Sequence, residues 1–144
     1  MKLLKKYAFL TMVLVAIANV QMVSAQRQAT PIYMYGFAAS FNDSTVYFTE
    51  IQEVTGAVVG EKTKFLYGRD AYSHQLKTFL QGLGEEYPTC ITAFATTRKQ
   101  IEKKYLKLRK RYLNKEGRDI RYINATEFKF SPIAPEVETT EAKQ

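Results

Sequence analysis

Apolar residues recur with a helical period along the stretch Thr97–Asn114. Four of them follow one another at spacings of four, three and four, so they form one stripe along an α-helix: Ile101, Tyr105, Leu108 and Tyr112. Burying such a stripe contributes at most roughly 6–10 kcal/mol, whereas repulsion between like charges one turn apart costs only about 0.2–0.5 kcal/mol per pair. We therefore predict a stable helix whose apolar side, widened on one flank by Leu106 and Leu113, faces the core.

The opposite side of this predicted helix is strongly basic. Glu102 is the only acidic residue between Arg98 and Lys115. Long helices are usually polar outside, so this side is either an ordinary solvated surface or a docking face for an anion. About 1 kcal/mol per lysine near an anionic surface makes such docking weak and sensitive to salt. The basic residues that form the candidate docking face are Lys99, Lys103, Lys104, Lys107, Lys110 and Arg111.

Two stretches rich in aromatic and β-branched residues precede the helices. Ile32–Phe41 is almost continuously apolar, Thr45–Val54 alternates more clearly, and Asn42-Asp43 between them supplies turn residues. The first stretch has one face of large side chains and one face of small ones, and either face is suited to a core. These features predict a hairpin with a definite register: Phe37 opposite Phe48 and Ala38 opposite Tyr47.

A second amphipathic stretch and two further strands complete the predicted fold. Apolar residues recur at helical spacing after Asp70, which we expect to be the N-cap of the first helix. Thr89–Ala95 is the predicted third strand, and Asp119–Ile123 continues into Phe128–Phe130 as the last. The order β-β-α-β-α-β predicts an α+β fold, in which two one-sided helices and a four-stranded mixed sheet form a two-layer sandwich.

The number of elements resembles that of ferredoxin-like domains and of SPOR-type peptidoglycan-binding domains, which also lay two helices on a four-stranded sheet. Their order, β-α-β-β-α-β, differs from the order here, and no sequence motif matches. The resemblance is therefore one of architecture, and it implies no function.

The first 25 residues have the composition of a secretory signal peptide. Lysines precede Tyr7–Val20, an apolar run without charge, and Val23-Ser24-Ala25 supplies small residues before a cleavage site. The run is shorter than the roughly 20 apolar residues that span a bilayer. We predict cleavage before Gln26, a polar leader at 26–30, a single domain at 31–130 and a disordered acidic tail at 131–144. The mature protein is then exported, to the periplasm or beyond the cell, in soluble form.

Positive charge is concentrated in one segment of the chain. The formal net charge is +7, and residues 98–121 contain eleven basic and three acidic residues. Such a helix often binds nucleic acid, but export argues against that partner. We hypothesise an exported, non-enzymatic binding module whose basic helix face docks on an anionic envelope component or an acidic protein surface. The alternative is an aromatic sheet face, left open by the helices, that binds a protein, a glycan or a second copy of the chain. An uncharacterised enzyme ranks third.

Residues with catalytic or metal-binding chemistry are few. The chain has one histidine, His74, and one cysteine, Cys90. One exposed histidine does not make a zinc site, and Cys90 lies in a predicted strand, where a small buried thiol is ordinary. We expect no catalytic site, metal or cofactor. Asp43-Ser44-Thr45 resembles a three-residue O-glycosylation motif of exported bacterial proteins, which makes Ser44 a candidate modification site.

Overall fold

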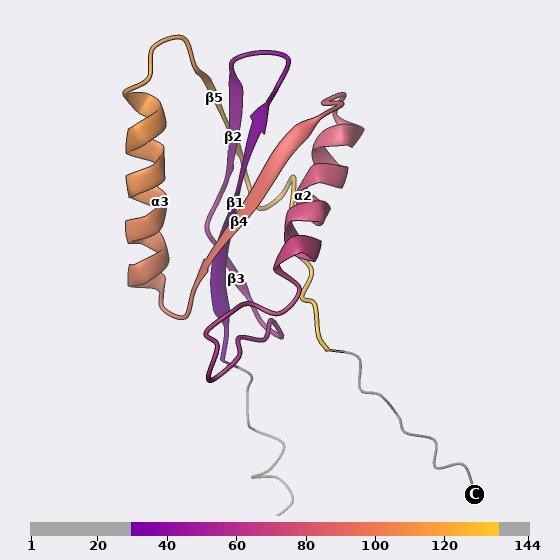
Figure 1. Ribbon diagram of the computed structural model, residues 1–144, viewed down its shortest axis with the longest axis vertical. Coiled ribbons are helices and arrows are strands. Elements are labelled where there is room, and N and C mark those ends of the chain that lie inside the picture. The colour runs from indigo at the N-terminus through magenta and orange to yellow at the C-terminus, as the bar shows by residue number, and fades with distance from the viewer. Residues whose placement is uncertain (1–29, 136–144) are drawn as a thin grey trace, which may run out of the picture.

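The computed structural model describes residues 30–135 (Figure 1). The predicted signal peptide, most of the leader and most of the acidic tail lie outside these residues. The α+β class and the element order are confirmed, except that the second strand is divided in two. In chain order the elements are β1 (Ile32–Ser40), β2 (Thr45–Thr49), β3 (Gln52–Val54), α2 (Arg69–Gly82), β4 (Pro88–Ala95), α3 (Arg98–Leu113) and β5 (Asp119–Ile123).

Strand β1 is the centre of a mixed sheet. It pairs antiparallel with β2 and β3 along one side and with β4 along the other, and β5 pairs parallel with β2. At the break between β2 and β3, the Glu50 N–H donates to the carbonyl of Ile123 in β5, 2.9 Å away. The predicted hairpin register is confirmed: Phe37 lies opposite Phe48 and Ala38 opposite Tyr47.

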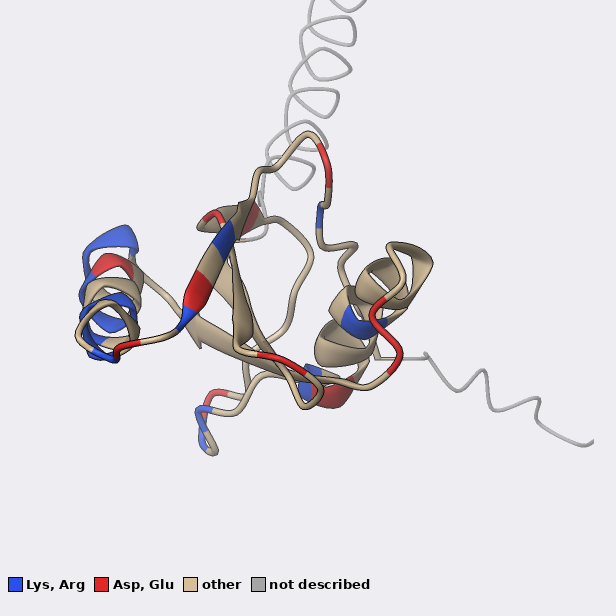
Figure 2. Ribbon diagram, turned by 90° about the horizontal axis from the view of Figure 1, so that it is seen from above, with Lys and Arg blue, Asp and Glu red and all other residues tan. Residues whose placement is uncertain are grey.

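The two helices lie on opposite faces of the sheet, so the predicted two-layer arrangement is corrected to three layers (Figures 1 and 2). Successive side chains of a strand point to opposite faces. Met34 packs in one core with Leu76 of α2, whereas the neighbouring Tyr35 packs in another core with Ile101 of α3. The physical reason is that β1 is apolar on both faces, and each apolar face needs a helix to exclude water from it.

The face of β1 with small side chains receives α2. Gly36 has no side chain, and a Cβ atom built there would lie 2.6 Å from Leu76 Cδ2 and 3.2 Å from Phe130 Cζ. Tyr72, Leu76 and Leu80 of α2 are fully buried against this face. Glycine at this position therefore allows α2 to approach the sheet closely.

The face with large side chains receives α3 through aromatic contacts. The ring centroids of Tyr35 and Tyr105 lie 5.1 Å apart, edge to face, and those of Phe37 and Tyr112 lie 4.7 Å apart. Phe48 is fully buried beneath the same helix. Aromatic pairs of this kind contribute about 0.5–1.5 kcal/mol each beyond the area that they bury.

Two local predictions were wrong. The N-cap of α2 is Gly68, in a left-handed conformation (φ 69°), and Asp70 lies within the first turn instead. Phe128–Phe130 does not continue the last strand, because the side-chain amide of Gln52 replaces a strand partner: its Nε2 donates to the carbonyl of Phe128 and its Oε1 accepts from the N–H of Phe130, both at 2.9 Å. Both phenylalanines of this segment pack in the core under α2.

The close approach at Gly36 predicts a stability difference between two Gly→Ala variants. Gly36→Ala should lower the free energy of unfolding by about 1–3 kcal/mol, because the added methyl group overlaps Leu76. Gly82→Ala is the control, since nothing lies within 4 Å of its Cβ position, and it should be neutral or stabilise by up to about 1 kcal/mol. Urea unfolding followed by circular dichroism measures both. Equal stabilities would contradict close packing of α2 on β1.

Candidate anion-binding groove

Local sequence determines where the basic helix α3 begins and ends. The hydroxyl of Thr97, the N-cap, accepts from the Gln100 N–H at 3.3 Å, and Asn114 is the C-cap. The predicted apolar stripe is confirmed, with Ile101 fully buried and the other three residues half-buried against the sheet. Leu106 and Leu113 do not widen it, because 58% and 54% of these residues is exposed. The buried side of α3 is therefore narrow, and most of its circumference faces solvent.

All six basic residues selected from the sequence are exposed, and Figure 2 shows the concentration of basic residues on α3. None of the six forms an ion pair with an acidic residue within 30–135. The ion pairs of this part of the chain are Arg98–Glu102, at 3.1 Å, and Arg121–Asp119, at 3.0 Å. The described acidic residues therefore leave the charge of this face uncompensated.

The structure separates the six basic residues into two groups. Lys104, Lys107 and Arg111 line a groove of about 380 Å³ between α3 and β4. The remaining three residues, Lys99, Lys103 and Lys110, do not line this groove. We call this hollow the cationic groove.

A fourth cation, Arg69, enters the cationic groove from the start of α2. Sequence reasoning missed it, because Arg69 lies about 35 positions before Lys104 along the chain and no local pattern connects the two. The two residues meet at the outer edge of β4, which among residues 30–135 pairs with no strand other than β1. Arg69 Nε donates to the carbonyl of Thr92 at 3.0 Å, and Lys104 Nζ donates to the carbonyl of Phe94 at 2.9 Å.

These two cations hold fixed positions at the strand edge. Both also lie over the ring of Phe94, with Arg69 Cζ 5.7 Å and Lys104 Nζ 5.6 Å from its centroid. Cation–π contacts of this type contribute about 0.5–1 kcal/mol at exposed sites. Because these side chains, from α2 and α3, cover the outer edge of β4, they also oppose its pairing with another chain.

Lys107 and Arg111 differ from this pair in their hydrogen bonding. Within the described part of the chain, neither side chain donates a hydrogen bond to another residue. They are therefore the basic groups of the cationic groove that are available to a ligand, and an anionic group is the ligand chemistry that suits them.

The aromatic sheet face that the alternative hypothesis requires is covered by α3. Tyr35, Phe37 and Phe48 are 3%, 6% and 0% exposed. Two exposed apolar residues lie instead at the edge of the area that α3 covers. Phe41, which follows β1, is 79% exposed, and Ile91 of β4 is 48% exposed. A partner that docks here would therefore meet Phe41 and Ile91 rather than an open aromatic face.

Side chains that could together bind a metal ion do not gather in the described residues. Residues 30–135 contain no cluster of three or more His, Cys, Asp or Glu side chains that could hold a metal ion. His74 is exposed on α2, and Cys90 is half-buried in β4. Burial raises the pKa of the Cys90 thiol to about 11, which Lys77 opposes only in part. A thiol of such high pKa is a poor nucleophile at neutral pH.

Ser44 lies exposed in the turn between β1 and β2. The carboxylate of Asp43 accepts a hydrogen bond from the Thr45 N–H at 2.8 Å, which lowers the pKa of Asp43 and fixes the turn. The side chain of Ser44 is accessible there, and its modification stays a prediction. Among residues 30–135, no helix has the length and apolar character needed to cross a membrane.

The raised pKa of Cys90 predicts slow modification of the thiol. With a pKa of about 11, only about one thiol in a thousand is ionised at pH 8, because each unit between pH and pKa is a factor of ten. The folded protein should react with a chromogenic disulfide reagent at least tenfold more slowly than the protein in urea, and its rate should rise steeply toward pH 11. Equal rates in the two states at pH 8 would contradict the burial of this group.

Comparisons with protein-family models, curated protein sequences and solved structures gave no match to this chain. The candidate site is therefore defined by its own geometry: a helix with an uncompensated cationic surface, packed beside an exposed strand edge.

Proposed function

We propose that this protein is a small exported binding module that docks an anionic partner on the basic side of α3. The observation that carries the proposal is the set of six exposed cations without an acidic partner among the described residues. Because α3 is held to the sheet by its buried stripe, its basic side chains need not hold the helix in place. Apart from Lys104, which donates to the carbonyl of Phe94, they donate no hydrogen bond among the described residues and can serve a partner. An anionic component of the cell envelope is the partner that an exported protein meets.

The cationic groove is the favoured part of this surface. Arg69 and Lys104 are positioned by β4, and Lys107 and Arg111 extend the positive charge along α3. Four cations that converge on one hollow attract an anion more strongly than the same number spread over a convex helix face, since low-dielectric walls focus the field. The outer lysines contribute long-range attraction that salt screens over about 10 Å at 0.1 M ionic strength.

Charge reversal at matched positions tests this proposal. Lys107→Glu with Arg111→Glu should weaken binding to vesicles of anionic phospholipid at least tenfold, since each cation near such a surface contributes about 1 kcal/mol. Lys99→Glu with Lys103→Glu changes the net charge equally outside the cationic groove and should have the smaller effect. Vesicle sedimentation at 50 and 300 mM salt measures the affinities. A wild-type protein that shows no salt-dependent binding would contradict the proposed function.

Export is the second part of the proposal, and it rests on the composition of residues 1–25. When the full chain is expressed in a bacterium with a secretory pathway, the protein should leave the cytoplasm and begin at Gln26. Fractionation followed by intact-mass measurement determines both. Replacement of Ala25 by a bulky residue, Ala25→Trp, should block cleavage and leave the longer chain. An unprocessed wild-type chain in the cytoplasmic fraction would contradict export.

A further inference from the structure

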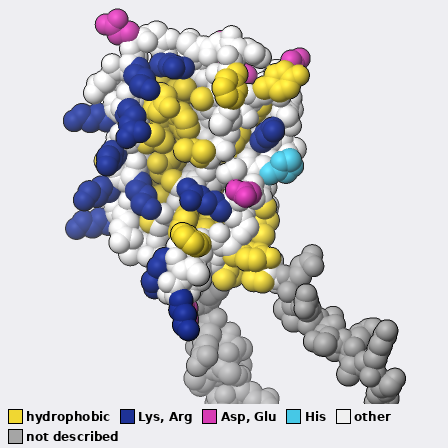
Figure 3. All heavy atoms as spheres, in the orientation of Figure 1, with side chains coloured by type: hydrophobic (Ala, Val, Ile, Leu, Met, Phe, Trp, Pro, Cys, Tyr) yellow, Lys and Arg dark blue, Asp and Glu magenta, His cyan; other side chains and the backbone are white. Residues whose placement is uncertain are grey.

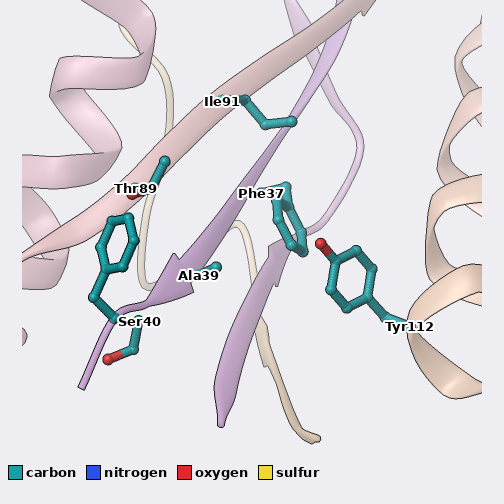
Figure 4. A pocket seen from close by; sticks show the side chains of 7 residues that line it. Phe37, Ala39, Ser40, Thr89, Ile91 and Tyr112 are labelled. Atoms are coloured by element: carbon teal, nitrogen blue, oxygen red, sulfur yellow. The ribbon is translucent and has the colours of Figure 1, made fainter. Parts of the chain in front are cut away.

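An apolar pocket of about 240 Å³ adjoins the cationic groove. It opens between the hairpin end of β1, the start of β4 and the last turns of α3, and its apolar lining includes Phe37, Phe41, Ile91 and Tyr112. In Figure 4, Tyr112 reaches from α3 toward Phe37, and Ile91 projects from β4 over the same space. We call this hollow the aromatic pocket.

The aromatic pocket and the cationic groove form one continuous surface. Ile91 lines both of them. Tyr112 of the pocket directly follows Arg111 of the groove on α3, so the change from basic to apolar lining takes place within one turn of the helix. Figure 3 shows this arrangement from outside, with an apolar strip beside the basic side chains.

We propose that this surface binds a fatty acid, with the carboxylate held by Lys107 and Arg111 and the acyl chain in the aromatic pocket. The inference rests on the proposed function, since it uses the same cationic groove and specifies the class of its ligand. An inorganic anion would leave Phe41 and Ile91 exposed, whereas an uncharged apolar ligand would leave the cations without a partner. A ligand with an anionic head and an apolar chain satisfies both, and burial of its chain adds to the weak attraction of charge alone.

The strand edge favours an acyl chain over an extended peptide. A peptide that added a strand to β4 would need its outward carbonyl groups. The carbonyls of Thr92 and Phe94 already accept hydrogen bonds from Arg69 and Lys104. An acyl chain makes no backbone hydrogen bonds, so its binding in the adjoining aromatic pocket displaces neither cation.

The size of the aromatic pocket favours a single chain. Its volume of about 240 Å³ is roughly that of eight water molecules at about 30 Å³ each. This is room for part of one acyl chain and not for two chains side by side. A monoacyl ligand is therefore expected to bind in preference to a diacyl lipid.

Calorimetric titration of the chain from Gln26 onward, which contains every described residue of the fold, tests the inference. Hexanoate, octanoate and decanoate are compared at pH 8, below their micellar concentrations, and decanol is the uncharged control. Affinity should rise about fourfold per added methylene until the aromatic pocket is full, and decanoate should bind at least tenfold more tightly than decanol. Affinity that does not depend on chain length, or decanol that binds as tightly as decanoate, would overturn the inference.

Two pairs of variants assign the binding to this surface. Arg111→Gln should weaken decanoate binding at least fivefold and leave decanol unchanged, whereas Lys62→Gln, at an exposed lysine in the loop before α2, should change either affinity less than twofold. Ile91→Thr, which keeps a β-branched residue in the strand, should weaken decanoate binding, and Leu106→Thr, at an exposed leucine elsewhere on α3, should not. Equal effects within either pair would overturn the placement of the ligand.

The same experiments separate failure of this inference from failure of the proposed function. Salt-dependent binding to anionic vesicles without chain-length dependence for the carboxylates overturns the fatty-acid assignment and leaves the anion-docking function in place. Absence of both kinds of binding overturns both.

Discussion

Burial of β1 on both faces is the constraint from which the rest of the structure follows. Its side chains alternate between two cores, and Met34 and Tyr35, adjacent in sequence, are both almost completely buried on opposite sides. Leaving either face open would expose its apolar surface to water, at a free-energy cost of about 25 cal/mol for each Å². One helix cannot cover both faces, so α2 and α3 lie on either side of the sheet. The small residues of one face admit α2 closely, and the aromatic residues of the other meet the tyrosines of α3.

This arrangement explains why α3 can carry so many cations. The helix is stabilised by Ile101 and by aromatic contacts on one narrow side, so its exposed surface is not required for packing. Its position also brings Lys104 to the outer edge of β4, opposite Arg69 from α2. The proposed groove thus depends on elements from both layers of helices. Neither helix alone would assemble it.

Much of the fold was predictable because its signals are local. The limits of α3 follow from Thr97 and Asn114, and the hairpin register follows from a turn centred on Asn42-Asp43. The number of layers was predicted wrongly, although it could have been predicted. β1 is apolar at both odd and even positions, and this pattern already indicates burial on two faces. Two features were not predictable from sequence pattern, because each depends on contacts between distant segments. They are the position of Arg69 at the edge of β4 and the hydrogen bonds of the Gln52 side chain to the segment Phe128–Phe130.

The claim that ligands bind between α3 and β4 is tested most directly by amide NMR shift mapping. The ¹⁵N-labelled chain from Gln26 onward is titrated with decanoate, and the shift of every assigned backbone amide is recorded. The account predicts the largest shifts along one continuous surface, at Ile91 and Ala93 of β4 and at Lys107 and Arg111 of α3. Largest shifts on the outer side of α2 or along β5, with those four amides unmoved, would contradict it.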